Sequence, residues 1–140
     1  MSKKLIIDTI VLEGIDKTGK DTIQQYIYRL RKGRYAVYNR GNISNAAYDK
    51  IFNRNEYIER ELPKNFLFIL LTVDPDDLKI RFEINNEPKI DREYHAEVFY
   101  ETFYDLTEGH YRLEFNTTEV TAYNIAKQIL EFADNINGLS

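Results

Sequence analysis

The chain has 140 residues, 43% of them hydrophobic and 30% charged, which is typical of one globular domain spanning residues 1–140. Its net charge of −4, with no block of like charges, argues against binding nucleic-acid polymers through phosphate neutralisation. The absence of cysteine excludes disulfides, thiolate metal sites and cysteine nucleophiles. The strongest apolar run, residues 66–73, is too short to cross a bilayer, so we expect a cytoplasmic protein that does not bind membranes.

The first half of the chain predicts two strands and two helices. Residues 5–12 are short, apolar and β-branched, which is typical of a buried strand. A helix should begin at about Asp21 with one apolar face, and Gly33 is placed to end it. Residues 35–38 predict a second strand and residues 44–53 a second helix.

The second half continues the alternation of strands and helices. In chain order it predicts a strand at 66–73, a helix at 76–84, a turn at 85–89, a helix at 90–106 and a strand at 111–115. Asn116–Glu119 resembles a capping box that would introduce a final helix. The order predicts an α/β fold of three layers, a short and mostly parallel sheet flanked by helices.

A phosphate-binding motif lies between the first strand and the first helix. Its pattern is Gly-x-x-x-x-Gly-Lys, from Gly14 to Lys20. The glycines allow a tight loop whose backbone N–H groups point at phosphate oxygens, and the helix N-terminus adds partial positive charge. Lys20 supplies a full charge for the β- and γ-phosphates. The context of strand, loop and helix predicts a P-loop NTPase fold that binds a nucleotide.

The residue after the lysine departs from the usual motif. A Ser or Thr normally stands there and its hydroxyl binds Mg²⁺, but this chain has Asp21. A carboxylate is a hard oxygen ligand that can bind Mg²⁺ directly, and Thr22 is a replacement candidate. The alternative is that Asp21 only caps the helix in a protein that has lost catalysis.

Three segments together resemble the thymidylate kinases and related deoxynucleoside monophosphate kinases, including the short versions that phages carry. The strand and loop at residues 11–20 are similar to the phosphate loop of that family, with its Glu-Gly-x-Asp beginning. Asn39-Arg40-x-x-x-Ser44-x-x-Ala47-Tyr48 resembles its Asp-Arg motif, and residues 71–81 resemble the strand that leads to its lid.

The resemblance implies an enzyme that uses ATP and Mg²⁺, and it implies roles for individual residues. Lys20 would hold the transferring phosphoryl group, and Arg40 would bridge donor and acceptor phosphates. Nucleotide binding would involve Gly14, Asp16, Lys17, Thr18, Gly19, Lys20, Asp21 and Thr22, with Asp21 on the metal. The acceptor substrate would contact Asp16, Arg40, Ser44 and Tyr48.

The resemblance also implies a lid at about residues 82–95. Arg81, Lys89 and Arg92 flank the break at Pro88, and such a lid closes positive charge over the phosphates. Arg92 is accordingly the third candidate catalytic residue, beside Lys20 and Arg40. The other interpretation of these arginines is ordinary surface charge.

Two departures from the family bear on the acceptor. Asn39 stands where the family has Asp, and an amide cannot accept a proton. That loss affects a nucleoside acceptor, which benefits from a general base, more than a monophosphate acceptor. Glu13 and Asp21 are the nearest substitute carboxylates.

The second departure is a shortened acceptor region, because few residues separate Gly33 from Asn39. Three explanations stay open. Arg40, Tyr48 and nearby aromatic residues rebuild the acceptor pocket, a second subunit of a homodimer completes it, or the acceptor is a different molecule.

Three hypotheses follow. The leading one is ATP-dependent phosphoryl transfer to a deoxynucleoside monophosphate similar to dTMP. A deoxynucleoside kinase is the alternative within the enzyme class. The third is a catalytically weakened nucleotide-binding protein with a regulatory role. In each of them the partners are small-molecule nucleotides.

Overall fold

A parallel sheet forms the centre of the chain in a computed structural model that describes residues 4–15, 18–84 and 92–139. Within these residues the sheet has the strand order β2-β1-β3-β4, and every neighbouring pair is parallel. The strands are β1 (Thr9–Glu13), β2 (Ala36–Asn39), β3 (Phe66–Thr72) and β4 (Tyr111–Asn116). The predicted α/β fold is confirmed, and its described sheet is parallel throughout.

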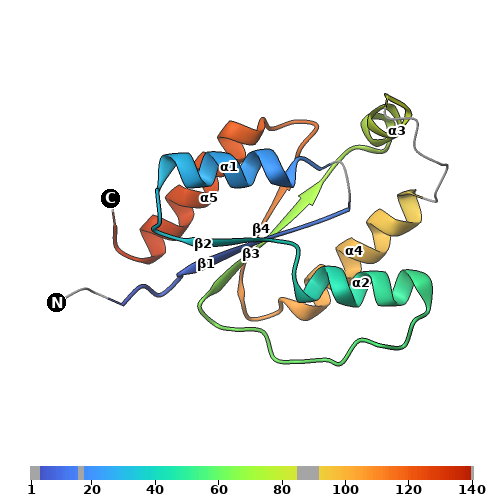
Figure 1. Cartoon of the computed structure of the whole chain (residues 1–140), viewed down its shortest axis with the longest axis horizontal. Coiled ribbons are helices and arrows are strands. Elements are labelled where there is room, and N and C mark those ends of the chain that lie inside the picture. The colour runs from blue at the N-terminus through green and yellow to red at the C-terminus, as the bar shows by residue number, and fades with distance from the viewer. Residues whose placement is uncertain (1–3, 16–17, 85–91, 140) are drawn as a thin grey trace.

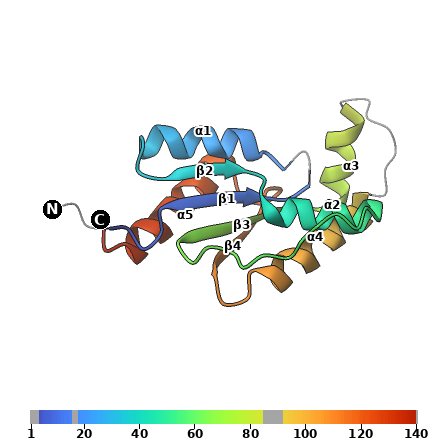
Figure 2. The same ribbon diagram turned by 60° about the horizontal axis from the view of Figure 1, so that its bottom comes forward.

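Helices cover both faces of this sheet. Figures 1 and 2 show α1 (Lys20–Leu30) and α5 (Ala122–Ile136) on one face, with α2 (Asn42–Phe52) and α4 (Arg92–Leu106) on the other. The helix α3 (Pro75–Ile84) stands beyond the end of the sheet at which the strands finish. This arrangement gives the three layers that the sequence predicts. In the described part of the chain, no helix combines the length and apolar character that crossing a membrane requires.

The core follows from the alternation of side chains along the strands. Ile10 and Leu12 of β1 are fully buried and pack in one cluster with Ile23 of α1 and Ile129 of α5. Val11, between them, points to the opposite face and packs in the cluster that includes residues of α2 and α4. Successive strand residues point to opposite faces, so an unbroken apolar strand can bury both.

A buried carboxylate fastens the C-terminal end of α1 to α5. Asp134 of α5 accepts hydrogen bonds from Arg31 (2.9 Å), Arg34 (3.0 Å) and Tyr35 (2.6 Å), which lie where α1 turns into β2. Burial would raise the pKa of Asp134, but these hydrogen bonds outweigh it and lower the pKa. Burial and the bond to Asp134 raise the pKa of Tyr35 to about 12. The network holds the segment between α1 and β2 against α5.

The predicted capping box at Asn116–Glu119 is wrong. The last helix begins later, with Thr121 as its N-cap, whose hydroxyl accepts a hydrogen bond from the first turn. Two side chains of the predicted box instead donate to Asp74 and Asp77. Their hydrogen-bonding groups therefore tie the loop after β4 to α3 and are not available for a helix terminus.

Two boundaries in the first third also differ from the prediction. The first strand begins at Thr9 because the backbone of Ile7 bonds to the Asn137 side chain in both directions, at 2.8 and 2.9 Å, instead of to a neighbouring strand. The first helix is capped by Arg31, and Gly33 lies in the turn that follows, with a φ of 70°.

Candidate functional site

The loop between β1 and α1 requires glycine at two positions. Gly14 has a φ of 145°, and a Cβ there would lie 2.6 Å from the carbonyl oxygen of Leu71. Gly19 has a φ of 84° and is the N-cap of α1, without a side-chain cap. Asp16 and Lys17, predicted for the same loop, lie outside the described residues. The two glycines therefore serve the close packing and the left-handed turn that a tight phosphate loop needs.

Lys20 places its ammonium inside this loop. The Nζ atom donates to the carbonyl oxygens of Gly14 (2.9 Å) and Ile15 (2.7 Å) and to the hydroxyl of Thr18 (3.1 Å). The side chain is buried, and this burial lowers the pKa of Lys20 to about 8 although two nearby carboxylates act in the opposite direction. A positive charge is therefore fixed where the motif predicts phosphate oxygens.

A hollow of about 630 Å³, which we call the phosphate hollow, opens beside the loop, where β2 ends and α1 begins. In an open parallel sheet, ligands bind at the carboxyl ends of the strands, which is where this hollow lies. Six predicted site residues line it together with two others: Thr18, Gly19, Lys20, Asp21, Thr22 and Arg40, then Gln24 and Asn39. Gln24, which the sequence analysis missed, donates to the carbonyl oxygen of Val37 at 3.2 Å.

Asp21 and Asn39 contact one another in the wall of this hollow. The Asn39 amide donates to Oδ1 of Asp21 at 2.5 Å, which joins the end of β2 to the first turn of α1. The N-cap position belongs to Gly19, so Asp21 does not cap the helix.

The hollow supplies oxygen ligands for Mg²⁺ but no complete cage. In the described ranges, no three acidic or histidine side chains gather as a metal site. Mg²⁺ is usually bound by one or two carboxylates together with substrate phosphates and water. The single carboxylate of Asp21, beside the hydroxyl of Thr22, fits that mode of binding.

Glu13 is a fully buried carboxylate at the end of β1. Its Oε2 accepts a hydrogen bond from the Ser44 hydroxyl at 2.8 Å, while Oε1 has no hydrogen-bond partner among the residues that the structure describes. Burial raises the pKa of Glu13 to about 7, although the hydrogen bonds from Ser44 and the charge of Lys20 act to lower it. Glu13 thus links the strand that leads into the phosphate loop to the N-terminal turn of α2.

Arg40 stands between two hollows. Its φ is 81°, and its backbone N–H donates to the Leu12 carbonyl oxygen at 2.9 Å, which fixes the turn between β2 and α2. Besides the phosphate hollow, it lines a second, mainly apolar hollow of about 220 Å³, whose walls include Tyr38 and Phe66. Arg40 is therefore the predicted residue that borders both the phosphate loop and the face near α2.

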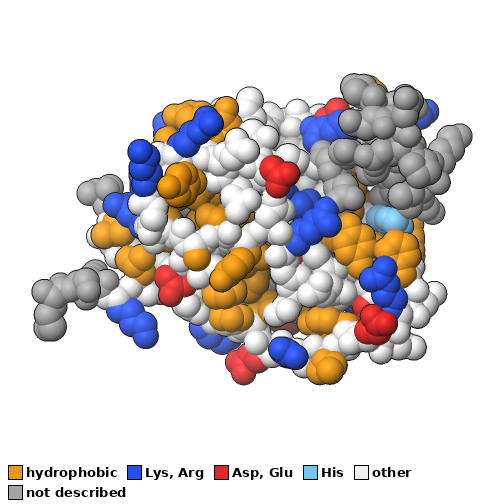
Figure 3. All heavy atoms as spheres, in the orientation of Figure 1, with side chains coloured by type: hydrophobic (Ala, Val, Ile, Leu, Met, Phe, Trp, Pro, Cys, Tyr) orange, Lys and Arg blue, Asp and Glu red, His pale blue; other side chains and the backbone are white. Residues whose placement is uncertain are grey.

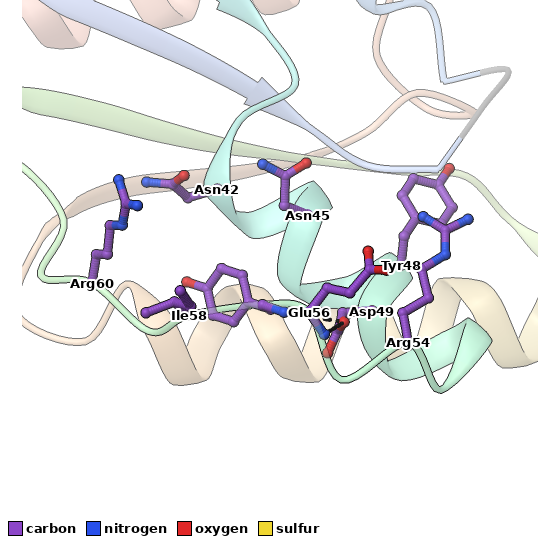
Figure 4. Close-up of a pocket in the computed structure, with 9 residues that line it drawn as sticks. Asn42, Asn45, Tyr48, Asp49, Arg54, Glu56, Ile58 and Arg60 are labelled. Carbon is purple, nitrogen blue, oxygen red and sulfur yellow. Dashed lines mark hydrogen bonds between the residues drawn. The ribbon is translucent and has the colours of Figure 1, made fainter.

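A polar pocket of about 430 Å³ lies against α2 (Figure 4). Its walls come from α2 and from the loop that follows it: Asn42, Asn45, Tyr48, Asp49, Arg54, Glu56, Tyr57, Ile58 and Arg60. Figure 4 shows Tyr48 and Arg54 at one end and Arg60 at the other. Asp49 holds the loop by accepting the backbone N–H groups of Glu56 (2.7 Å) and Tyr57 (3.2 Å). We call this cavity the α2 pocket.

The predicted substrate-binding residues do not lie in one place. Tyr48 lines the α2 pocket and packs edge-on against Phe99, with ring centroids 5.1 Å apart. Ser44 lines neither the phosphate hollow nor the α2 pocket; it is buried, and its hydroxyl donates to Glu13. Arg40 borders the phosphate hollow. The sequence does not predict the part of the α2 pocket that follows the helix. This segment has no periodic pattern, and its role depends on how it folds back over α2.

The predicted lid lies largely outside the described residues. This applies to residues 85–91, which include Lys89, and to the side chain of Arg92, whose backbone begins α4. Arg81 is described, and its guanidinium donates to Asp77 (2.7 Å) and to the hydroxyl of Thr117 (3.1 Å). These bonds fasten α3 to the loop after β4.

Charged side chains are dispersed on the face of the molecule that Figure 3 draws. In Figure 3, Lys and Arg side chains stand among acidic and apolar ones rather than in one continuous patch.

Comparison with known proteins gives a structural likeness. No protein-family model matches the chain, and no curated protein matches it. The crystal structure of the YorR protein from Bacillus subtilis, in complex with phosphorylated GDP, superposes with a TM-score of 0.76. The match covers 90% of this chain and 95% of YorR at 16% sequence identity. The likeness supports the P-loop NTPase-like fold.

Proposed function

We propose that the chain binds ATP with Mg²⁺ and transfers the γ-phosphoryl group to a deoxynucleoside monophosphate similar to dTMP. The observation that carries this proposal is the Lys20 ammonium, held inside a glycine loop and beside a hollow that Arg40 also lines. Two cationic side chains that line one hollow suit a reaction in which catalysis is mainly positioning and charge stabilisation. The fold likeness to a protein bound to phosphorylated GDP supports nucleotide binding.

The phosphate loop is the proposed donor site. Its proposed nucleotide-binding residues are Gly14, Asp16, Lys17, Thr18, Gly19, Lys20, Asp21 and Thr22. Asp21 would hold Mg²⁺, which when bound neutralises charge on the phosphates. Lys20 holds the phosphoryl group, while Arg40 and Arg92 stabilise the charge that spreads over it during transfer.

The α2 pocket is the proposed place of the acceptor nucleoside. Tyr48 offers an aromatic face there, and Arg54 and Arg60 line the same walls. Asn45, in the N-terminal turn of α2, lines this pocket and offers an amide for a nucleobase edge. Arg40 and Asp16 would meet the acceptor phosphate, and Ser44 would act by holding α2 through its bond to Glu13.

The choice between a nucleoside and a monophosphate acceptor depends on whether a side chain at the site can act as a general base. Asn39 lines the phosphate hollow but cannot accept a proton, whereas a monophosphate acceptor already presents an anionic oxygen. One observation favours the deoxynucleoside kinase alternative. Burial raises the pKa of Glu13 to about 7, which is suitable for a general base. Against it, Glu13 is fully buried and engaged with Ser44, so we favour the monophosphate.

Release of ADP from ATP and Mg²⁺, measured with a panel of nucleosides and nucleoside monophosphates, tests the proposal. We expect turnover with deoxynucleoside monophosphates and none with the matching nucleosides, because the chain supplies cations rather than an exposed base. Turnover of nucleosides, without turnover of monophosphates, would establish the deoxynucleoside kinase alternative. Turnover of no acceptor, alongside ATP binding, would leave a nucleotide-binding protein with a regulatory role and reject both enzyme hypotheses.

A further inference from the structure

The contact between Asp21 and Asn39 joins two residues that the sequence analysis treated separately. One is in the first turn of α1 and the other is the last residue of β2, and both line the phosphate hollow. The amide of Asn39 engages Oδ1 of Asp21. Lys20 is next to Asp21 in sequence, but it directs its ammonium to oxygens of the loop.

The chemistry of the contact depends on which residue carries the charge. An amide N–H donates to a carboxylate, whereas two carboxylates at this separation could not both be ionised without strong repulsion. A hydrogen bond to one carboxylate oxygen restricts the rotation of the side chain, and leaves the second oxygen able to accept a ligand. Asn39 therefore does for Asp21 what hydrogen-bond partners commonly do for metal-binding carboxylates.

We propose that Asn39 is a positioning residue that holds Asp21 in the orientation in which its carboxylate binds the Mg²⁺ accompanying the nucleotide. The inference rests on the proposed function, because it assumes that phosphates occupy the hollow. It assigns to Asn39 a role that requires no proton transfer.

The test is a double-mutant cycle on metal-dependent binding. The full chain, Asn39→Ala, Asp21→Ala and the double variant are titrated by calorimetry with a non-hydrolysable ATP analogue, once with Mg²⁺ and once with a chelator. The quantity compared is the ratio of the two dissociation constants, which reports how much Mg²⁺ tightens binding. A merely structural role of Asn39 would change both constants together and leave this ratio unchanged.

We expect Asn39→Ala to reduce the Mg²⁺ effect by about tenfold in the wild-type background, as losses of such partners do at metal sites. In the Asp21→Ala background the same change should alter it by no more than about twofold. Gln25→Ala is the matched control, because Gln25 is an exposed amide on α1 that does not line the hollow. That variant should retain the wild-type ratio.

An equal loss in both backgrounds, or no loss in Asn39→Ala, would overturn the inference. Failure of the wild-type chain to bind the analogue in either buffer would instead reject the proposed function, and this inference with it. The two failures are thus distinguished by the wild-type titration alone.

Discussion

Replacing Lys20 with alanine should weaken binding of a non-hydrolysable ATP analogue by about 100-fold or more. The side chain brings a buried ammonium within 2.7–3.1 Å of three oxygens of the loop. Truncating a charged group in a desolvated site costs several kcal/mol, because the charge of the ligand then meets no compensating charge. Calorimetric titration with Mg²⁺ present measures the loss directly.

A matched control separates this effect from a general change in charge. Lys127→Ala removes an exposed lysine from α5 and should leave the affinity unchanged. Circular dichroism and urea unfolding of Lys20→Ala establish that the variant is folded, and Lys20→Met, which keeps most of the apolar stem, provides a second variant. If a folded Lys20 variant bound the analogue as tightly as the wild-type chain, the phosphate loop would not be the donor site.

Replacing Glu13 with glutamine should change how the stability of the chain depends on pH. Burial raises the pKa of Glu13 from 4.5 to about 7, so the folded chain keeps a proton that the unfolded chain releases. Between these pH values the folded state binds more protons, and raising the pH therefore lowers the free energy of unfolding. At about 1.4 kcal/mol per pKa unit the full loss is about 3 kcal/mol.

Urea unfolding at intervals from pH 4.5 to 8 tests this expectation. Glu13→Gln cannot ionise, so its free energy of unfolding relative to the wild-type chain should rise across this range by about 3 kcal/mol. Glu131→Gln, at an exposed position on α5, serves as the control and should follow the wild-type curve. A difference between Glu13→Gln and wild type that stays constant with pH would show that the pKa of Glu13 is the same in the folded and unfolded chains, and that burial does not raise it.

The fold could be predicted from the sequence because its strongest signals are local. The unbroken apolar run of β3 and the glycine motif after β1 specify a buried strand and a phosphate loop without reference to distant residues. The start of the last helix could not be predicted in the same way. The polar stretch at Asn116–Glu119 has the composition of a helix cap, but its side chains find partners near α3, which is a tertiary effect.

The site was only partly predictable for the same reason. The motif identified Lys20 and Asp21, yet the partner of Asp21 lies 18 residues away and meets it only because α1 packs beside β2. The burial of Glu13 likewise depends on how α2 is placed over the strand end. The α2 pocket required a loop without periodicity to fold back, held by Asp49, and no pattern in the sequence reports that.

Backbone amide spectra of the ¹⁵N-labelled chain test the central claim most directly, because the account places the nucleotide phosphates on the phosphate loop itself. On addition of Mg²⁺ and a non-hydrolysable ATP analogue, the amide signals of Gly14, Thr18, Gly19 and Lys20 should shift most. Signals of β4, at the opposite edge of the sheet from β2, should stay in place. Unmoved loop amides in the presence of bound analogue, or shifts gathered at a different part of the chain, would contradict the account.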